Sequence, residues 1–273
     1  MNKLKLFDVS LRDGLQSIQK IYSISEKKDL FYKILNKYNP HSIEIGSIVS
    51  PKVLPQMHNS VELFHHANKS KFSNLYMLTP NLNSVNIAIK NNIKNYSLIT
   101  SVSNEFQKKN INKDLNDTKK QLKDIICVLK DNNVNNIKLY VSCINKCPIS
   151  GNQDVSYVLN ELHYYINNYK NNIDEFCLSD TCGTLEFEVF KNILTKLIIY
   201  HGNSNIIDKL SLHLHRNENF ENTSKIISYA YEKGIRRFDV SCLENAGGCS
   251  VTIDDSKLNN NLHYDDYKEI FNK

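Results

Sequence analysis

The sequence predicts a (β/α)8 barrel, also called a TIM barrel, in which eight parallel strands alternate with helices. Eight short apolar segments recur along the 273 residues, and helical patterns separate them. No GxGxxG or GxxxxGK motif follows any of these segments, which disfavours the alternative of a doubly wound open sheet with a phosphate-binding loop. No linker or internal repeat divides the chain, so we expect a single barrel domain over residues 1–273.

Each expected strand is a short run of mainly apolar residues, a pattern typical of buried parallel strands. Runs of this kind are too short for helices of ordinary length. The expected strands are residues 4–9, 42–45, 74–78, 96–100, 137–141, 175–178, 210–214 and 237–240.

The segments between these strands carry the signals of amphipathic helices. Ser23 and Glu26 have the spacing of a capping box, which would begin the first helix. Residues 117–130 place apolar side chains at the i, i+3, i+4, i+7 positions of one face. Residues 186–200 repeat this pattern and stop at Gly202, as expected at a helix C-terminus.

The composition is that of a globular protein, with 41% hydrophobic and 23% charged residues. No apolar run approaches the roughly 18 residues of a membrane helix, so we expect no membrane partner. The net charge is +5, but the Lys residues are scattered among acidic ones, so we expect no nucleic-acid partner. The N-terminus lacks the pattern of a signal peptide, which predicts a cytoplasmic protein whose seven Cys are mostly reduced.

Polar and ionisable residues gather at the expected C-terminal ends of the strands. Barrels of this kind place their active sites at that end. We therefore expect these side chains to surround one site. They are Arg12 and Asp13 after the first strand, Glu44 in the second, Asp180 after the sixth, and His213 and His215 at the seventh.

His213 and His215 are two positions apart on an expected strand, so both imidazoles project from the same side. They could bind one cation together, the alternative being two buried structural histidines. Imidazoles alone would suit zinc or iron. With Asp13 and an amide oxygen added, the site becomes suitable for Mg²⁺ or Mn²⁺.

The cysteines carry weaker signals. Cys249 follows Gly247 and Gly248, and its position alone favours an ordinary loop thiol. Cys143 and Cys147 lack the second pair of a zinc site, so we interpret them as structural.

The sequence resembles the 3-hydroxy-3-methylglutaryl-CoA (HMG-CoA) lyases, a branch of the barrel superfamily of metal-dependent lyases and aldolases. The matching motifs follow the family's order and span nearly the whole chain. Two long runs, SIVSPKVLPQM at 47–57 and YVSCINKCP at 140–148, point to the lyase branch. The others are VSLRDGLQ at 9–16, LTPNL at 78–82, KKNIN at 108–112, SDT at 179–181, HLH at 213–215 and GGC at 247–249.

The resemblance implies metal-dependent cleavage of HMG-CoA to acetoacetate and acetyl-CoA, with a divalent cation, Mg²⁺ or Mn²⁺, as cofactor. It implies an acyl-CoA substrate as the small-molecule partner. The implied metal ligands are Asp13, His213, His215 and Asn261.

The resemblance also implies catalytic roles for Arg12, Asp13, His213 and Cys249. Arg12 would stabilise the enolate charge on the thioester oxygen, and Cys249 would assist in acid–base chemistry. The residues implied in binding or supporting the substrate are Arg12, Gln16, Glu44 and Asp180.

Two departures from the family pattern leave alternatives open. The usual Asp-Thr-Tyr-Gly after His215 is replaced by residues 216–219, RNEN, and the usual Pro-Tyr-Ala after Cys249 by residues 250–252, SVT. The alternatives are a related acyl-CoA or 2-oxo-acid lyase or aldolase, and a non-catalytic barrel that retains the metal site. The oligomeric state is also open, with a homodimer among the expected states.

Overall fold

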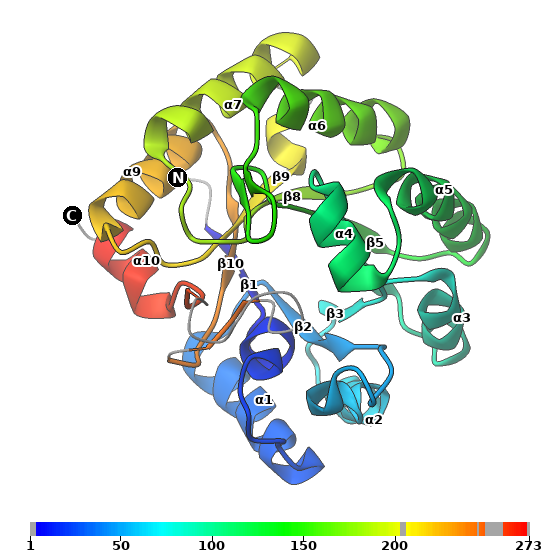
Figure 1. The fold of residues 1–273 in the computed structure, drawn as a ribbon. Helices are drawn as coiled ribbons and strands as arrows, with labels where there is room; N and C mark the ends of the chain where they lie inside the picture. Colours follow the sequence, from blue (N-terminus) through cyan, green and yellow to red (C-terminus); the bar gives the residue numbers. More distant parts are fainter. Residues whose placement is uncertain (1–3, 203–205, 245, 249–258, 272–273) are drawn as a thin grey trace.

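The computed structural model describes residues 4–202, 206–244, 246–248 and 259–271. Within them, eight parallel strands form a closed barrel in the order β1-β10-β9-β8-β5-β4-β3-β2, which confirms the predicted fold class. Figure 1 looks along this barrel and shows the helices outside the ring of strands.

All eight predicted strands are present, with ends that differ from the prediction by a few residues at most. The barrel closes because β1 pairs in parallel with both β10 and β2. The strands are β1 (Lys5–Asp8), β2 (Ser42–Ser47), β3 (Leu75–Leu78), β4 (Asn95–Ser101), β5 (Asn136–Ser142), β8 (Glu175–Asp180), β9 (Leu210–Leu214) and β10 (Arg237–Val240).

A small antiparallel hairpin, β6 (Lys146–Cys147) and β7 (Gly151–Asn152), follows β5. It was not predicted, because strands of two residues are too short for an alternating pattern. Its first strand contains Cys147, and both Cys147 and Cys143 are buried, in agreement with a structural interpretation.

The two helices predicted from apolar periodicity, over residues 117–130 and 186–200, are confirmed. The Ser23–Glu26 capping box is formed at the start of α1, and α7 ends at Gly202. The helices are α1 (Ile24–Tyr38), α2 (Ser60–Ala67), α3 (Leu82–Lys90), α4 (Asn104–Ile111), α5 (Leu115–Asp131), α6 (Val155–Tyr169), α7 (Phe187–His201), α9 (Phe220–Glu232) and α10 (Tyr264–Phe271). Among the described residues, no helix is long and apolar enough to cross a membrane.

The main hydrophobic core packs the helices against the outside of the barrel, through side chains such as Ile43, Leu139 and Phe190. Two smaller apolar clusters are separate from it, one of Phe7, Val9 and Tyr76 and the other of Leu78, Tyr140 and Cys177. Barrel interiors are usually filled by branched apolar side chains. Here fully buried charged residues also come from the strands, among them Glu44, Lys138 and Asp239.

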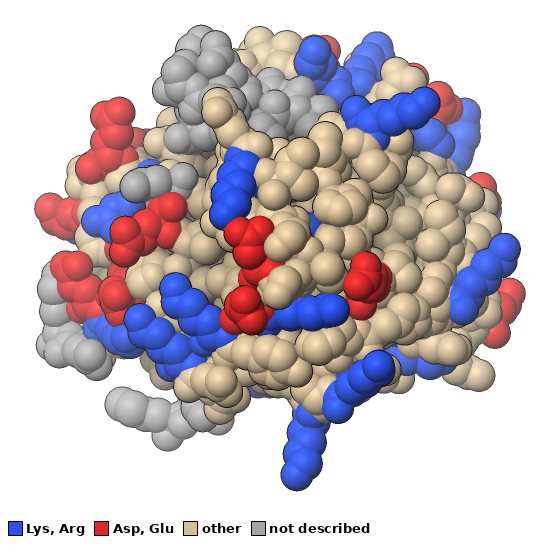
Figure 2. Space-filling model, turned by 90° about the horizontal axis from the view of Figure 1, so that it is seen from below, with Lys and Arg blue, Asp and Glu red and all other residues tan. Residues whose placement is uncertain are grey.

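The surface charge is mixed on the side of the molecule that Figure 2 shows. Lys and Arg side chains lie among Asp and Glu side chains there rather than in a single basic patch. This arrangement agrees with the scattered charge of the sequence.

Candidate metal and substrate site

The site begins in one turn of π-helix, η1 (Ser10–Gly14), which directly follows β1 and carries Arg12 and Asp13. Both side chains are buried. The Asp13 Oδ2 atom accepts hydrogen bonds from Gly248 N at 3.0 Å and from Asn261 Nδ2 at 2.9 Å. Its Oδ1 atom accepts from Arg12 and, at 3.0 Å, from Gln16 Nε2. These bonds fix the carboxylate at the end of the barrel.

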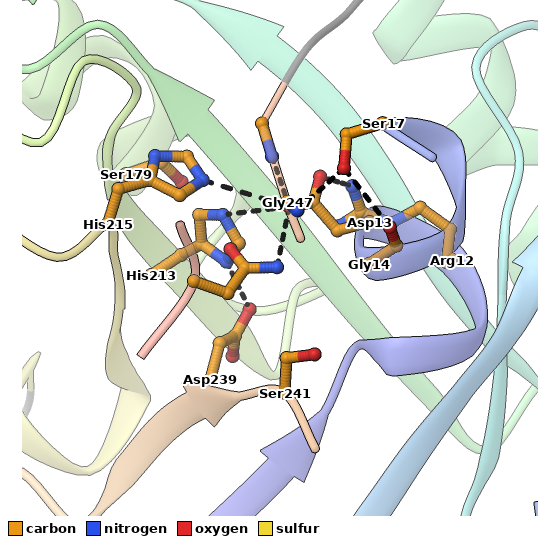
Figure 3. A network of polar contacts seen from close by, with 12 residues as sticks. Arg12, Asp13, Gly14, Ser17, Ser179, His213, His215, Asp239, Ser241 and Gly247 are labelled. Atoms are coloured by element: carbon orange, nitrogen blue, oxygen red, sulfur yellow. Dashed lines mark hydrogen bonds and ion pairs between the residues drawn. The ribbon is translucent and has the colours of Figure 1, made fainter. Parts of the chain in front are cut away.

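His213, in β9, and His215, directly after it, project toward Asp13 (Figure 3). Their Nε2 atoms lie 3.9 and 3.7 Å from Asp13 Oδ2. One candidate ligand atom from each of the three residues lies within 4.8 Å of the others, and among the described residues this is the one group of His, Cys, Asp or Glu found that could hold a metal ion. The pattern on the strand therefore brings both imidazoles to one carboxylate.

The hydrogen bond of His215 shows which of its nitrogens is available. Its Nδ1 lies 2.9 Å from the backbone carbonyl oxygen of Asp180, which can only accept a hydrogen bond. Nδ1 therefore carries a proton, and in the neutral imidazole the lone pair lies on Nε2. This buried Nε2 has no hydrogen-bond partner among the described residues.

Asn261 reaches the same place from a distant part of the sequence. It pairs with His215 as an isolated β-bridge, and its backbone N donates to the Ala246 carbonyl at 3.0 Å. Gly247 allows the approach, because a Cβ atom there would lie 2.4 Å from Asn261 Cγ. The Asn261 Oδ1 atom is buried and has no partner within the described part of the chain.

These residues fit a divalent cation. Two buried acceptors, His215 Nε2 and Asn261 Oδ1, lack partners in the described ranges, and the Asp13 carboxylate lies beside them. Buried polar atoms are rarely left without a partner unless an ion or water satisfies them. A carboxylate oxygen, an amide oxygen and two imidazole nitrogens form a mixed set that Mg²⁺ or Mn²⁺ can accept.

Opposite charges at the site stabilise each other's ionised forms and shift the pKa values of the side chains. Burial opposes ionisation of Asp13, but Arg12 and the two histidines outweigh it and hold the pKa of its carboxyl well below the ordinary value. Burial likewise opposes the charge on His215, yet Asp13 and Asp180 raise the pKa of its imidazole. Asp13 is therefore an anion in a buried site.

Arg12 bridges two carboxylates. Its Nε donates to Glu44 Oε2, and the Tyr140 hydroxyl donates to the same oxygen at 3.3 Å. Its guanidinium carbon lies 5.1 Å from the centroid of the Tyr140 ring. Burial opposes the charge, but Glu44 and Asp13 raise the pKa of Arg12, so the guanidinium stays cationic.

Of three other predicted site residues, Gln16 lines the cavity at the site, whereas Glu44 and Asp180 do not. Gln16 lines the cavity and donates to Asp13 and to the Gly248 carbonyl. Glu44 and Asp180 do not line it, since Glu44 holds Arg12 and the Asp180 carboxylate accepts from the backbone N atoms of residues 184 and 185. In this structure both carboxylates bind protein groups, a guanidinium and backbone N atoms, and neither faces the cavity. Cys249 lies outside the described residues.

The sequence reasoning missed Tyr140, Lys138 and Asp239. Tyr140 packs edge-on against His213, with ring centroids 5.7 Å apart, and Asp239 contacts the Nδ1 atom of His213 at 3.0 Å. Lys138 contacts Asp239. A signal was present for the last two, because each is a charged residue between two apolar neighbours inside a short expected strand.

A cavity of about 710 Å³ opens from this cluster. Arg12, Asp13, His213 and His215 lie at its buried end. Apolar side chains form much of its wall, and the exposed Lys109 also lines it. The cavity thus joins a charged end to an apolar channel. The main apolar lining residues are Ile48, Val49, Val53, Leu54, Leu78, Ile87, Ile99, Phe106 and Ile111.

Comparisons with known proteins give related sequences that are named as lyases. The mitochondrial hydroxymethylglutaryl-CoA lyase of Arabidopsis thaliana is 28% identical over 250 residues, which are 90% of this chain and 50% of that protein. A 3-hydroxy-3-isohexenylglutaryl-CoA/hydroxymethylglutaryl-CoA lyase of Pseudomonas aeruginosa is 30% identical over 163 residues, 59% of this chain and 54% of that protein. The chain thus spans about half the length of these two relatives.

Solved structures that resemble this chain are also named as HMG-CoA lyases. An HMG-CoA lyase of Acinetobacter baumannii, solved with coenzyme A and 3-methylmalate, has a TM-score of 0.84 and 25% identity and is matched over 98% of this chain and 83% of that one. The hydroxymethylglutaryl-CoA lyase of P. aeruginosa has a TM-score of 0.82 and 25% identity, over 99% of this chain and 85% of that one. The family model described as HMGL-like matches residues 3–251, and the chain therefore belongs to the HMGL-like family.

Proposed function

We propose that this protein is a carbon–carbon lyase that cleaves HMG-CoA to acetoacetate and acetyl-CoA with the help of a divalent cation. One observation carries the proposal above all. The side chains of Arg12, Asp13, His213 and His215 line the buried end of one cavity, and Asn261 contacts Asp13 beside them. A cation site beside a fixed positive charge is what this reaction requires, because negative charge develops on two different oxygens.

Asp13, His213, His215 and Asn261 would hold the cation, for which Mg²⁺ and Mn²⁺ are the candidates. A cation bound there would lower the pKa of the substrate's tertiary hydroxyl, which must lose its proton before the carbon–carbon bond breaks. The protein fixes the donors through its own contacts. Asp180 orients His215, and Gly247 admits Asn261.

Arg12 would bind the thioester oxygen of the substrate. When the bond breaks, acetyl-CoA leaves as an enolate whose charge lies largely on that oxygen, and a guanidinium already in place stabilises it without rearrangement. Glu44 and Tyr140 keep Arg12 in position. Arg12 carries its charge at every working pH, and its planar guanidinium can contact several oxygens at once.

The rest of the cavity suits an acyl-CoA. Its apolar wall would accept the pantetheine arm, and Lys109 would lie near the phosphate groups. The A. baumannii lyase was solved with coenzyme A, which supports this assignment. The proton-transfer role of Cys249, the cytoplasmic location and the homodimer remain predictions.

The proposal is tested by incubating the purified protein with HMG-CoA and Mn²⁺ or Mg²⁺ and measuring acetoacetate and acetyl-CoA separately. We expect equal amounts of both products, with activity lost in EDTA and restored by the cation. Asp13→Asn should abolish activity, whereas the exposed Asp117→Asn should not.

Two results would contradict the proposal. Cleavage of another acyl-CoA or of a 2-oxo acid, without cleavage of HMG-CoA, would favour the related lyase or aldolase. Cation binding without turnover of any of these compounds would favour a non-catalytic barrel.

A further inference from the structure

Behind the proposed cation site, a buried ion pair crosses the interior of the barrel. Lys138 comes from β5 and Asp239 from β10, and these strands are not neighbours in the barrel. The Lys138 ammonium nevertheless contacts the Asp239 Oδ1 atom directly. The two side chains are fully buried or nearly so, with exposed fractions of 0% and 1%.

Lys138 contacts three side chains besides Asp239. Its Nζ atom lies 3.0 Å from Glu175 Oε1, 3.7 Å from the centroid of the Phe7 ring and 4.7 Å from that of Tyr140. An ammonium group has three donors and no acceptor. It therefore donates a hydrogen bond to the Oδ1 atom of Asp239, and this contact favours the carboxylate form of Asp239.

The second oxygen of Asp239 faces the proposed cation site. Asp239 Oδ2 lies 3.0 Å from His213 Nδ1, and this contact is drawn in Figure 3. The backbone of Asp239 is also fixed, since the Tyr267 hydroxyl donates to its carbonyl at 2.9 Å. A carboxylate only accepts hydrogen bonds, so His213 carries a proton on Nδ1, and in its neutral form the lone pair of Nε2 is on the side of Asp13.

We propose that Lys138 and Asp239 are positioning residues that fix the tautomer and the ring orientation of His213, so that its Nε2 atom is available to the cation. This inference rests on the proposed function only in placing a cation at His213. It assigns the two histidines different supports, a carboxylate held by a lysine for His213 and a backbone carbonyl for His215. A change of side chain can therefore remove the first support but not the second.

The alternative is that Lys138 and Asp239 form an ion pair that only stabilises the barrel. In that case the Nδ1 contact of His213 would be incidental, and variants would change stability without changing the tautomer or the affinity for a cation. The two roles therefore differ in what they predict for His213 itself.

The first test reads the tautomer of His213 in the wild-type protein, and a variant serves only to assign its signals. We would record ¹⁵N spectra of the histidine rings at alkaline pH without metal and assign His213 by the signals lost in His213→Gln. The inference predicts a protonated Nδ1 and an unprotonated Nε2. A His213 ring protonated on Nε2 alone would overturn it.

The second test measures Mn²⁺ affinity directly, by electron paramagnetic resonance of the free ion. Asp239→Asn should weaken binding by about 10- to 100-fold, the usual effect of removing a hydrogen-bond partner of a metal-binding histidine. Lys138→Met should also weaken Mn²⁺ binding. Lys138→Arg should retain most of the wild-type affinity, because Arg keeps the positive charge and the hydrogen-bond donors. Thermal unfolding with EDTA present identifies any variant that has lost its fold.

Lys119→Met is the matched control. Lys119 makes a partly buried ion pair with Glu161 at 2.8 Å, between α5 and α6 and away from His213. Its loss should leave Mn²⁺ affinity unchanged. Wild-type affinity in a folded Asp239→Asn variant, or an equal loss in Lys119→Met, would overturn the inference.

The results also separate this inference from the proposed function. A protein that binds Mn²⁺ but cleaves no HMG-CoA would contradict the function, and the His213 tautomer and the Asp239→Asn affinity would still decide the inference. A wild-type protein that binds no Mn²⁺ would overturn both.

Discussion

At the scale of single residues, the site is defined by hydrogen bonds that leave particular atoms free. His215 Nδ1 donates to a carbonyl oxygen, and Asn261 Nδ2 donates to Asp13. The other polar atoms of these side chains, His215 Nε2 and Asn261 Oδ1, have no hydrogen-bond partner among the described residues. Small changes around these atoms should therefore affect cation binding more than they affect folding. A substitution at Gly247 tests this view.

Gly247→Ala should disturb Asn261. The new methyl group would lie 2.4 Å from Asn261 Cγ, so the amide must move away from Asp13. We expect Mn²⁺ affinity to fall roughly tenfold or more, as for other changes next to a metal ligand. Gly151→Ala is the control, because Gly151 also has a positive φ, of 82°, but no atom lies within 4 Å of its new Cβ. Equal Mn²⁺ affinities in the two variants would contradict the placement of Asn261.

Arg12→Lys should separate turnover from cation binding. A lysine keeps the charge but cannot bind Glu44, Asp13 and the thioester oxygen at once with the fixed geometry of a guanidinium. We expect kcat for HMG-CoA to fall by about 10²- to 10³-fold, the usual cost of losing an oxyanion-stabilising donor. Mn²⁺ titration should remain close to wild type, since Asp13 and both histidines are intact. A wild-type kcat would remove Arg12 from the proposed chemistry.

At the scale of elements, the last helix is tied to the first strand by a buried carboxyl. Asp8, in β1, accepts a hydrogen bond from the Tyr264 hydroxyl of α10 at 2.7 Å and from Ser10 N at 2.9 Å. Burial raises the pKa of Asp8 from 3.8 to about 6, although both hydrogen bonds oppose the shift. The burial of Asp8 therefore costs free energy once the carboxyl is ionised.

This raised pKa predicts a dependence of stability on pH. Between about pH 4 and pH 6 the folded protein keeps the Asp8 proton and the unfolded chain does not, so the free energy of unfolding falls as the pH rises. A shift of about two pKa units corresponds to roughly 3 kcal/mol. Asp8→Asn lacks this contribution, so its stability relative to wild type should rise by about that amount between pH 4 and pH 7.

Urea unfolding followed by circular dichroism at several pH values measures this difference. The same substitution at the exposed Asp29, in α1, is the control for the change of an Asp to an Asn. A difference between Asp8→Asn and wild type that does not vary with pH would contradict the raised pKa.

The strands and helices were predictable because their signals are local. An apolar run such as residues 137–141 and a capping box such as Ser23 and Glu26 depend only on neighbouring residues. The hairpin of β6 and β7 was missed because strands of two residues leave no pattern.

The contents of the site were only partly predictable. The strand pattern itself placed His213 and His215 on one side, and the structure brings Asp13 to them. The approach of Asn261 depends on Gly247 and on a pairing with His215, which are contacts between distant segments. The partners of Lys138 and Asp239 likewise follow from the closure of the barrel, which no local pattern reports.

At the scale of the whole molecule, closure of the barrel places the two ends of the chain at one site. Asn261 Nδ2 and Asp13 Oδ2, 248 positions apart in the sequence, lie 2.9 Å from each other, and β1 pairs with β10 over four residues on each strand. The proposed ligands come from η1, β9 and the segment before α10. Unfolding any of these segments would destroy the cation site, so binding should stabilise the entire barrel.

Saturating cation should therefore raise the melting temperature. A ligand that binds only the folded state at about 100 times its Kd adds roughly 2.7 kcal/mol to the free energy of unfolding. For a chain of this size that corresponds to a rise of roughly 5–10 °C, which scanning calorimetry with Mn²⁺ or with EDTA can resolve. His215→Ala should show no such rise, because it removes one of the donors that point at the site. His41→Ala, a change at the opposite end of the barrel beside β2, should respond to Mn²⁺ as wild type does. A rise of equal size in His215→Ala would mean that Mn²⁺ stabilises the protein from another place, and the proposed ligand set would be wrong.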